Sequence, residues 1–110
     1  MDHTYRLQAE LDTHELASLQ RFVAAVQEEA RQSVQKVDVT RIFRGAEGQI
    51  FVPVVIAAAR PDAHLAMLVE HKAEQLYEQS GCRFILVQRL ENDPQQLSHV
   101  WADGAWRTVP

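Results

Sequence analysis

The sequence has one cysteine, four glycines and four prolines among 110 residues, and no long hydrophobic run. The single Cys82 excludes an internal disulfide framework of the kind that small secreted domains use. No apolar stretch approaches the roughly 18 residues that a membrane-spanning helix needs. The first residues also lack the basic start and apolar core of a secretion signal. These absences predict a cytoplasmic protein without a membrane partner.

Lysine is also scarce, because nine of the eleven basic residues are arginine. Codon usage in a GC-rich bacterial genome would produce this bias. The formal net charge is −4, whereas nucleic-acid-binding domains commonly carry a strongly basic face. A nucleic acid is therefore not the expected partner. With 46% hydrophobic and 24% charged residues, the chain has the composition of one globular domain with a modest core.

What the chain does contain is a clear change of hydrophobic period along its length. Strand-like runs and helical spacing alternate in the order strand–helix–strand–strand–helix–strand, over residues 5–11, 16–34, 37–44, 49–58, 65–77 and 82–90. This order predicts an α+β fold of the split βαβ (ferredoxin-like, βαββαβ) type, an antiparallel sheet with two helices on one face. Residues 91–110 contain an Asp-Gly pair between alternating residues, which predicts a C-terminal β-hairpin. The whole chain, 1–110, is then a single α+β domain.

Local signals place the two helices. Asp12 followed three residues later by Glu15 forms a capping-box pattern. The second helix should begin after Pro61 and end at Ser80-Gly81. Its spacing predicts a buried stripe consisting of Leu65, Ala66, Val69, Ala73, Leu76 and Tyr77. His64 and His71 fall on the opposite, exposed side.

Pro53 lies inside an apolar run that should be a strand covered on both faces. Proline cannot donate a hydrogen bond to a sheet, so it belongs at edges or bulges. We therefore expect a bulge at Pro53 or a strand order that leaves its nitrogen side open.

No motif for catalysis or metal binding is present. His64 and His71 are seven residues apart, whereas ligands that share one metal ion on a helix lie three or four apart. Cys82 follows the end of a helix, where the helix dipole disfavours a thiolate, and is expected to be a buried structural cysteine. The stacking aromatics of an RNA-recognition motif are missing after Arg44-Gly45. No metal or other cofactor is expected.

The sheet face away from the helices should be apolar and crossed by arginines. The residues assigned to it are Ile42, Phe51, Val55, Ile85 and Val87, with Arg6, Arg44, Arg83 and Arg89. An apolar patch of this size is unusual on a monomer. A two-residue turn at Asp103-Gly104 would also place Trp101 and Trp106 opposite each other on one face of the hairpin.

These features favour a non-enzymatic, homodimeric protein-interaction module, with a second copy or another protein as its partner. The residues predicted to make the contact are Trp101, Trp106, Arg83, Arg89, Ile85 and Val87. The alternative is a small-molecule-binding protein, or a cofactor-independent ferredoxin-like enzyme, with a pocket near the C-terminal hairpin. The sequence identifies no catalytic residue.

Overall fold

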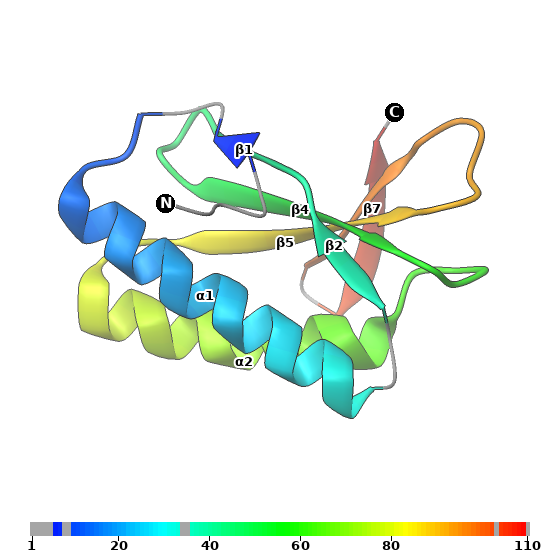
Figure 1. The fold of residues 1–110 in the computed structure, drawn as a ribbon, viewed down its shortest axis with the longest axis horizontal. Helices are drawn as coiled ribbons and strands as arrows, with labels where there is room; N and C mark the ends of the chain where they lie inside the picture. Colours follow the sequence, from blue (N-terminus) through cyan, green and yellow to red (C-terminus); the bar gives the residue numbers. More distant parts are fainter. Residues whose placement is uncertain (1–5, 8–9, 34–35, 103, 110) are drawn as a thin grey trace.

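The chain folds into a mixed β-sheet with two helices packed against one of its faces (Figure 1). The computed structural model describes residues 6–7, 10–33, 36–102 and 104–109. In chain order the elements are β1 (Arg6–Leu7), α1 (Thr13–Gln32), β2 (Val37–Val39), β3 (Arg41–Arg44), β4 (Ile50–Ile56), α2 (Ala63–Ser80), β5 (Phe84–Leu90), β6 (Ser98–Ala102) and β7 (Ala105–Val109). The strand order is β1-β3-β4-β5-β6-β7, with β2 also paired to β4. Neither of these two helices is long and apolar enough to cross a membrane.

The pairing of the strands corrects the predicted antiparallel, ferredoxin-like sheet. β1 pairs in parallel with β3, and β4 pairs in parallel with β5, while the remaining neighbours are antiparallel. In a split βαβ unit, another strand separates the two strands that the helix connects. Here α2 connects β4 and β5, which are direct neighbours. The predicted α+β class with two helices is confirmed, but the sheet is mixed. The unbroken apolar run of β4 is typical of a strand in a parallel pair that is covered on both faces.

The helix ends follow the predicted signals. The Asp12 carboxylate accepts a hydrogen bond from the Glu15 backbone N–H at 2.7 Å, and the Asp12 N–H donates to Glu15 Oε1 at 3.2 Å, which completes the capping box. Asp62 caps α2 by accepting from the Leu65 N–H at 3.0 Å. Gly81 ends α2 with a φ of 74°, a left-handed conformation that glycine adopts without strain.

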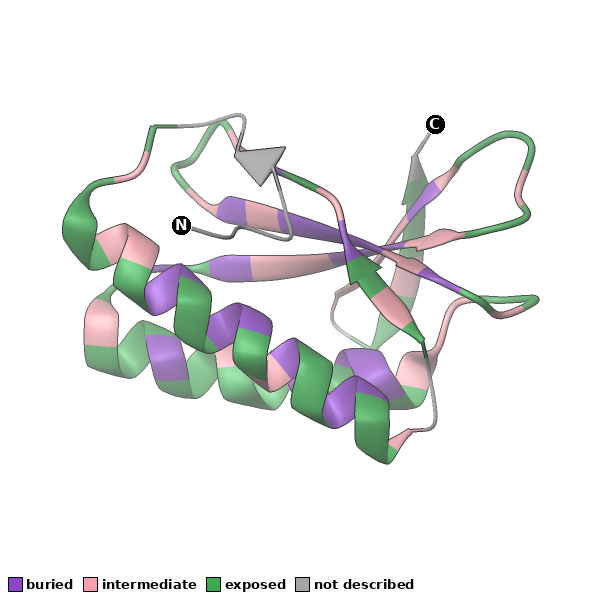
Figure 2. Ribbon diagram, in the orientation of Figure 1, coloured by how far each residue is buried: buried purple, intermediate pink, exposed green. Residues whose placement is uncertain are grey.

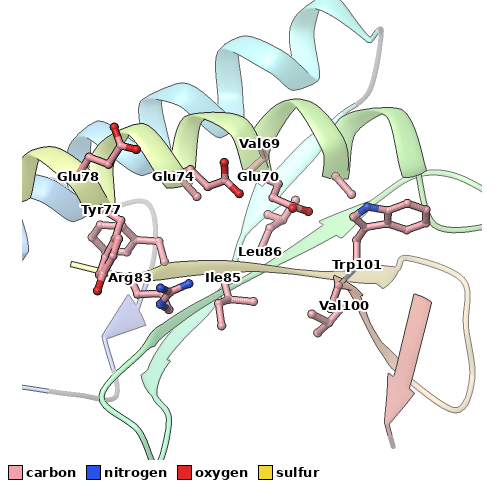
Figure 3. A pocket seen from close by; sticks show the side chains of 14 residues that line it. Val69, Glu70, Glu74, Tyr77, Glu78, Arg83, Ile85, Leu86, Val100 and Trp101 are labelled. Carbon is pink, nitrogen blue, oxygen red and sulfur yellow. The ribbon is translucent and has the colours of Figure 1, made fainter. Parts of the chain in front are cut away.

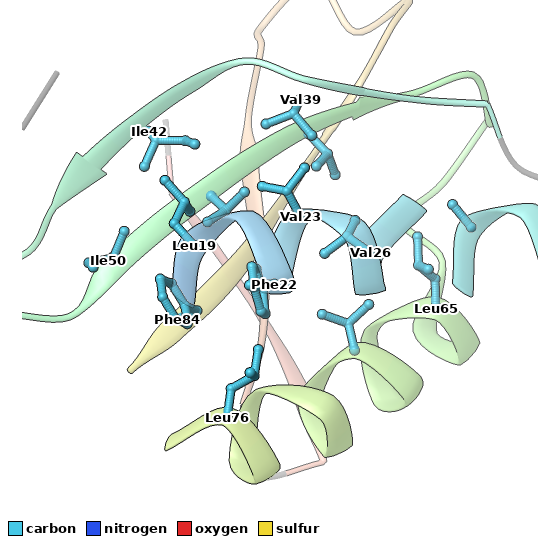
Figure 4. Close-up of a cluster of buried hydrophobic side chains, with 14 of the residues drawn as sticks. Leu19, Phe22, Val23, Val26, Val39, Ile42, Ile50, Leu65, Leu76 and Phe84 are labelled. Carbon is cyan, nitrogen blue, oxygen red and sulfur yellow. The ribbon is translucent and has the colours of Figure 1, made fainter. Parts of the chain in front are cut away.

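The hydrophobic core lies between the helices and the sheet (Figures 2 and 4). Phe22 of α1, which has no exposed surface, stacks on Phe84 of β5 with 5.0 Å between the ring centroids. The side chains of β4 that point to the helices are Ile50, Val52, Val54 and Ile56, and none is more than 1% exposed. Cys82 is buried beside this core, as predicted.

A bulge opposite Pro53 resolves the problem that proline poses in this strand. Val39 pairs with Val54 and Phe43 pairs with Phe51, so four residue steps along β2 and β3 oppose three steps along β4. The Thr40 N–H donates to the Pro53 carbonyl at 2.8 Å. The Pro53 nitrogen faces the same irregular edge, where its missing N–H is tolerated.

The same bulge corrects the prediction for Ile42. The extra residue shifts the alternation of β3, so Ile42 points to the helices and is fully buried. Phe43 takes its place on the outer face and stacks on Phe51, with 5.0 Å between the ring centroids. The predicted strand over residues 5–11 is described as strand only at Arg6–Leu7, and Leu11 lies beyond it, packed against the core. The side chain of Arg6 lies outside what the structure describes.

Gln88 connects the sheet to the start of α2. It is 1% exposed, its Oε1 accepts from the Asp62 N–H at 2.7 Å, and its Nε2 donates to the Asp62 carbonyl at 2.9 Å. We expect Gln88→Leu, which keeps the volume and removes both bonds, to lower the free energy of unfolding by about 1–3 kcal/mol. Chemical denaturation measures this change. Gln95→Leu at an exposed site is the control and should stay within about 0.5 kcal/mol; equal stability of the two variants would exclude the anchoring role of Gln88.

Candidate functional site

A cavity of about 440 Å³ lies between α2 and the strands β5 and β6, on the helix side of the sheet (Figure 3). This volume falls within the usual range of ligand pockets. Its apolar lining includes Ala66, Val69 and Ala73 of α2, Phe84 and Leu86 of β5, and Trp101 of β6. We call this feature the α2–β6 groove.

The groove exists because the sheet continues beyond the last helix. α2 packs along β5 and reaches β6, while the sheet goes on to β7. Gln88 pairs with His99, so two residues away Leu86 and Trp101 project from the same face. Figure 3 shows both side chains pointing towards α2, whereas Ile85 and Val100 point to the other face.

Trp101 forms one end of the groove, and Trp106 lies beside it. Trp101 pairs with Trp106 across the hairpin, as the sequence predicts, and the rings meet edge to face at 5.1 Å between centroids and 74° between planes. His99 makes a second edge contact with Trp106 at 6.4 Å. Both indoles are half-buried. The turn residue Asp103 lies outside the described residues, and Gly104 after it has a φ of 75°.

Tyr77 and Arg83 form the other end, and both depart from prediction. Tyr77, which the helical spacing predicts to be buried, is 44% exposed at the border of the groove. The Arg83 guanidinium lies 4.4 Å from the centroid of the Tyr77 ring, a cation–π contact. Strand alternation predicts Arg83 on the outer face. That rule does not apply to it, because β5 begins only at Phe84.

Three carboxylates line the α2 side of the groove: Glu70, Glu74 and Glu78. They lie four residues apart, so they follow one side of the helix. All three are exposed, and within the described ranges none of the three carboxylates has a hydrogen bond or an ion pair. These residues were not predicted from the sequence, although their regular spacing was the signal that could have indicated them.

The structure brings only some of the predicted contact residues together. Trp101 and Arg83 line the groove, and Trp106 supports Trp101. Ile85 borders the groove with its side chain turned to the outer face. Val87, on the same face as Ile85, is 3% exposed.

Two arginines predicted on the outer face are held by hydrogen bonds. Arg89 Nε donates to Ser98 Oγ at 3.0 Å. Arg44 pairs with Glu15 of α1, at 2.9 and 3.0 Å from its carboxylate oxygens, because β3 turns Arg44 to the helix side beside Ile50.

Nowhere in the described ranges do three or more His, Cys, Asp or Glu side chains gather in a way that could hold a metal ion. His64 and His71 are exposed on the flank of α2 away from the core. The groove itself combines apolar walls, an aromatic end and exposed carboxylates, which is chemistry suited to binding.

Comparison of the chain with protein-family models, with curated proteins and with solved structures found no match to any of them. The function must therefore be inferred from the geometry of the groove.

Proposed function

We propose that the protein is a non-enzymatic interaction module that docks a segment of another protein in the α2–β6 groove. The observation that carries the proposal is an apolar groove flanked by half-exposed aromatic side chains, Trp101 at one end and Tyr77 at the other. Tryptophan, tyrosine and arginine are the residues most enriched at the energetic centres of protein interfaces. Arg83 adds the third of these types.

The length of the groove favours a polypeptide over a metabolite. Its lining runs along α2 from Ala66 to Glu78, which at 1.5 Å per residue is about 18 Å. A small-molecule site usually encloses most of its ligand, whereas Tyr77 and the carboxylates on this wall are exposed. An elongated occupant can cover this surface and remain solvated along its outer side.

A peptide-display selection on the purified protein tests the proposal. We expect enriched peptides to bind the native protein and to lose at least about tenfold in affinity, or roughly 1.4 kcal/mol, on Ala73→Trp, which fills the groove. Trp101→Ala is a second variant that removes the aromatic wall instead. Circular dichroism and thermal unfolding confirm that each variant is folded.

Peptides that bind Ala73→Trp and native protein equally would overturn the proposal. So would a metabolite that raises the melting temperature of the native protein but not of Ala73→Trp, because stabilisation of that kind reports specific binding in the groove.

A homodimer is the second candidate, favoured by the edge of the sheet. Among the described residues, β7 pairs with β6 alone. The backbone N–H and C=O groups along its other edge can therefore form hydrogen bonds with another strand. Two copies related by a two-fold axis can pair β7 with β7 in an antiparallel fashion. Sedimentation at micromolar concentration would give twice the chain mass for such a dimer, and the mass of one chain at every concentration would exclude it.

A further inference from the structure

We infer that the occupant of the α2–β6 groove is a basic amphipathic helix, with Lys or Arg at positions i and i+4 facing Glu70 and Glu74. The inference rests on the proposed function and adds the conformation and charge of the partner. Three features carry it: the width of the uncovered sheet, the register of the carboxylates and the place of Arg83.

The width of the sheet beyond α2 fits one more helix. Strands lie about 4.8 Å apart, so β6 and β7 extend the sheet by roughly 10 Å past β5. Packed helices lie 8–10 Å apart. A third helix beside α2 would therefore rest on the face that carries Leu86 and Trp101, and it would bury apolar side chains against both.

The negative charge of the groove favours a partner helix that carries positive charge. Glu70 and Glu74 are exposed and have no ion-pair partner among the described residues. Two residues four apart on a helix are separated by about 6 Å along its axis. A partner helix lying alongside α2 matches this separation when its own basic residues are at i and i+4. The half-exposed indole of Trp101 at the same end offers a face for one of these cations.

Arg83 makes the two ends of the groove different in charge. Its guanidinium lies over the ring of Tyr77, at the end of the groove opposite Trp101. Tyr77 directly precedes Glu78 in α2. A basic residue of the partner would be repelled there. The two basic residues therefore belong at the Trp101 end, and the side chain opposite Arg83 should be neutral or acidic.

Three designed peptides test the inference. Each is about 16 residues long, enough to hold a helix with strong helix formers, and each has the same leucine face. They differ only at the two positions i and i+4, which carry Lys, Gln or Glu. Two exposed ion pairs and one cation–π contact predict that the Lys peptide binds about tenfold more tightly than the Gln peptide. The Glu peptide should be the weakest, and added salt should reduce the difference because exposed charges are screened beyond about 10 Å at 0.1 M.

Matched variants assign the effect to the groove. In the double variant Glu70→Gln with Glu74→Gln, the Lys and Gln peptides should bind with nearly equal affinity. Glu47→Gln with Glu91→Gln, which changes two exposed carboxylates elsewhere, should keep the full difference. A fourth peptide, the Lys sequence with a central proline, cannot form a continuous helix and should lose binding.

The outcomes separate this inference from the proposed function. If the three charge variants bound equally, or the Glu peptide bound best, while Ala73→Trp still abolished binding, the groove would remain a docking site but the basic helix would be excluded. Equal binding of the proline peptide would exclude the helical conformation. If no peptide bound, or if Ala73→Trp left all affinities unchanged, both the inference and the proposed function would be overturned.

Discussion

Phe22→Ala is expected to lower the free energy of unfolding by about 3–5 kcal/mol, because it removes a large ring from the centre of the core. Phe22 has no exposed surface and stacks on Phe84 across the interface between α1 and the sheet. Removing the ring leaves a cavity that rigid neighbours fill only in part. Thermal unfolding would record the loss as a lower melting temperature, roughly 4–8 °C for each kcal/mol in a domain of this size.

A graded variant and a surface control define this prediction. Phe22→Leu should cost less than Phe22→Ala, because the remaining side chain keeps part of the packing. Met67→Ala changes a residue of α2 that is 56% exposed, and it should stay within about 0.5 kcal/mol. If Phe22→Ala were as mild as Met67→Ala, α1 would not pack on the sheet through this ring.

Leu76→Ala should cost about 2–5 kcal/mol, and His71→Ala should stay within about 0.5 kcal/mol. Leu76 is 7% exposed in the core between the helices, while His71 is exposed on the other side of α2. Denaturant unfolding of the two variants compares the two faces of one helix. The pair therefore tests the rotation of α2, which also sets the direction of Glu70 and Glu74.

The opposite ranking would have a direct consequence for the groove. If His71→Ala destabilised the protein as much as Leu76→Ala, α2 would be rotated about its axis. The carboxylates would then no longer border Trp101, and the proposed charge recognition would lose its basis.

Local features of the fold could be predicted from the sequence because they depend on neighbouring residues. The Asp12–Glu15 capping box and the Gly81 end of α2 are each fixed within one turn of helix. Pairing between strands depends on contacts that are distant in the sequence. The apolar run of β4 indicates a strand covered on both faces, but it does not identify β5 as the parallel neighbour, and the order of elements alone predicts an antiparallel sheet.

The candidate site was predicted in part for the same reason. Trp101 and Trp106 face each other because a two-residue turn fixes their register locally. Pro53 indicates a bulge, but the sequence does not show that the extra residue lies in the neighbouring strand at Thr40, where it turns Ile42 from the outer face to the core. The groove itself depends on where α2 ends relative to the sheet, which is a tertiary relation between α2 and β6.

Chemical-shift mapping by NMR with the Lys peptide tests the central claim most directly. We predict that the largest shifts will occur at the indole N–H of Trp101 and at the amides of Ala73 and Glu74, which border the α2–β6 groove. The outer face, represented by Phe51 and Val55, should show little change. Shifts concentrated at Phe51 and Val55, with the Trp101 signal unmoved, would contradict the claim and place the docking surface on the opposite face of the sheet.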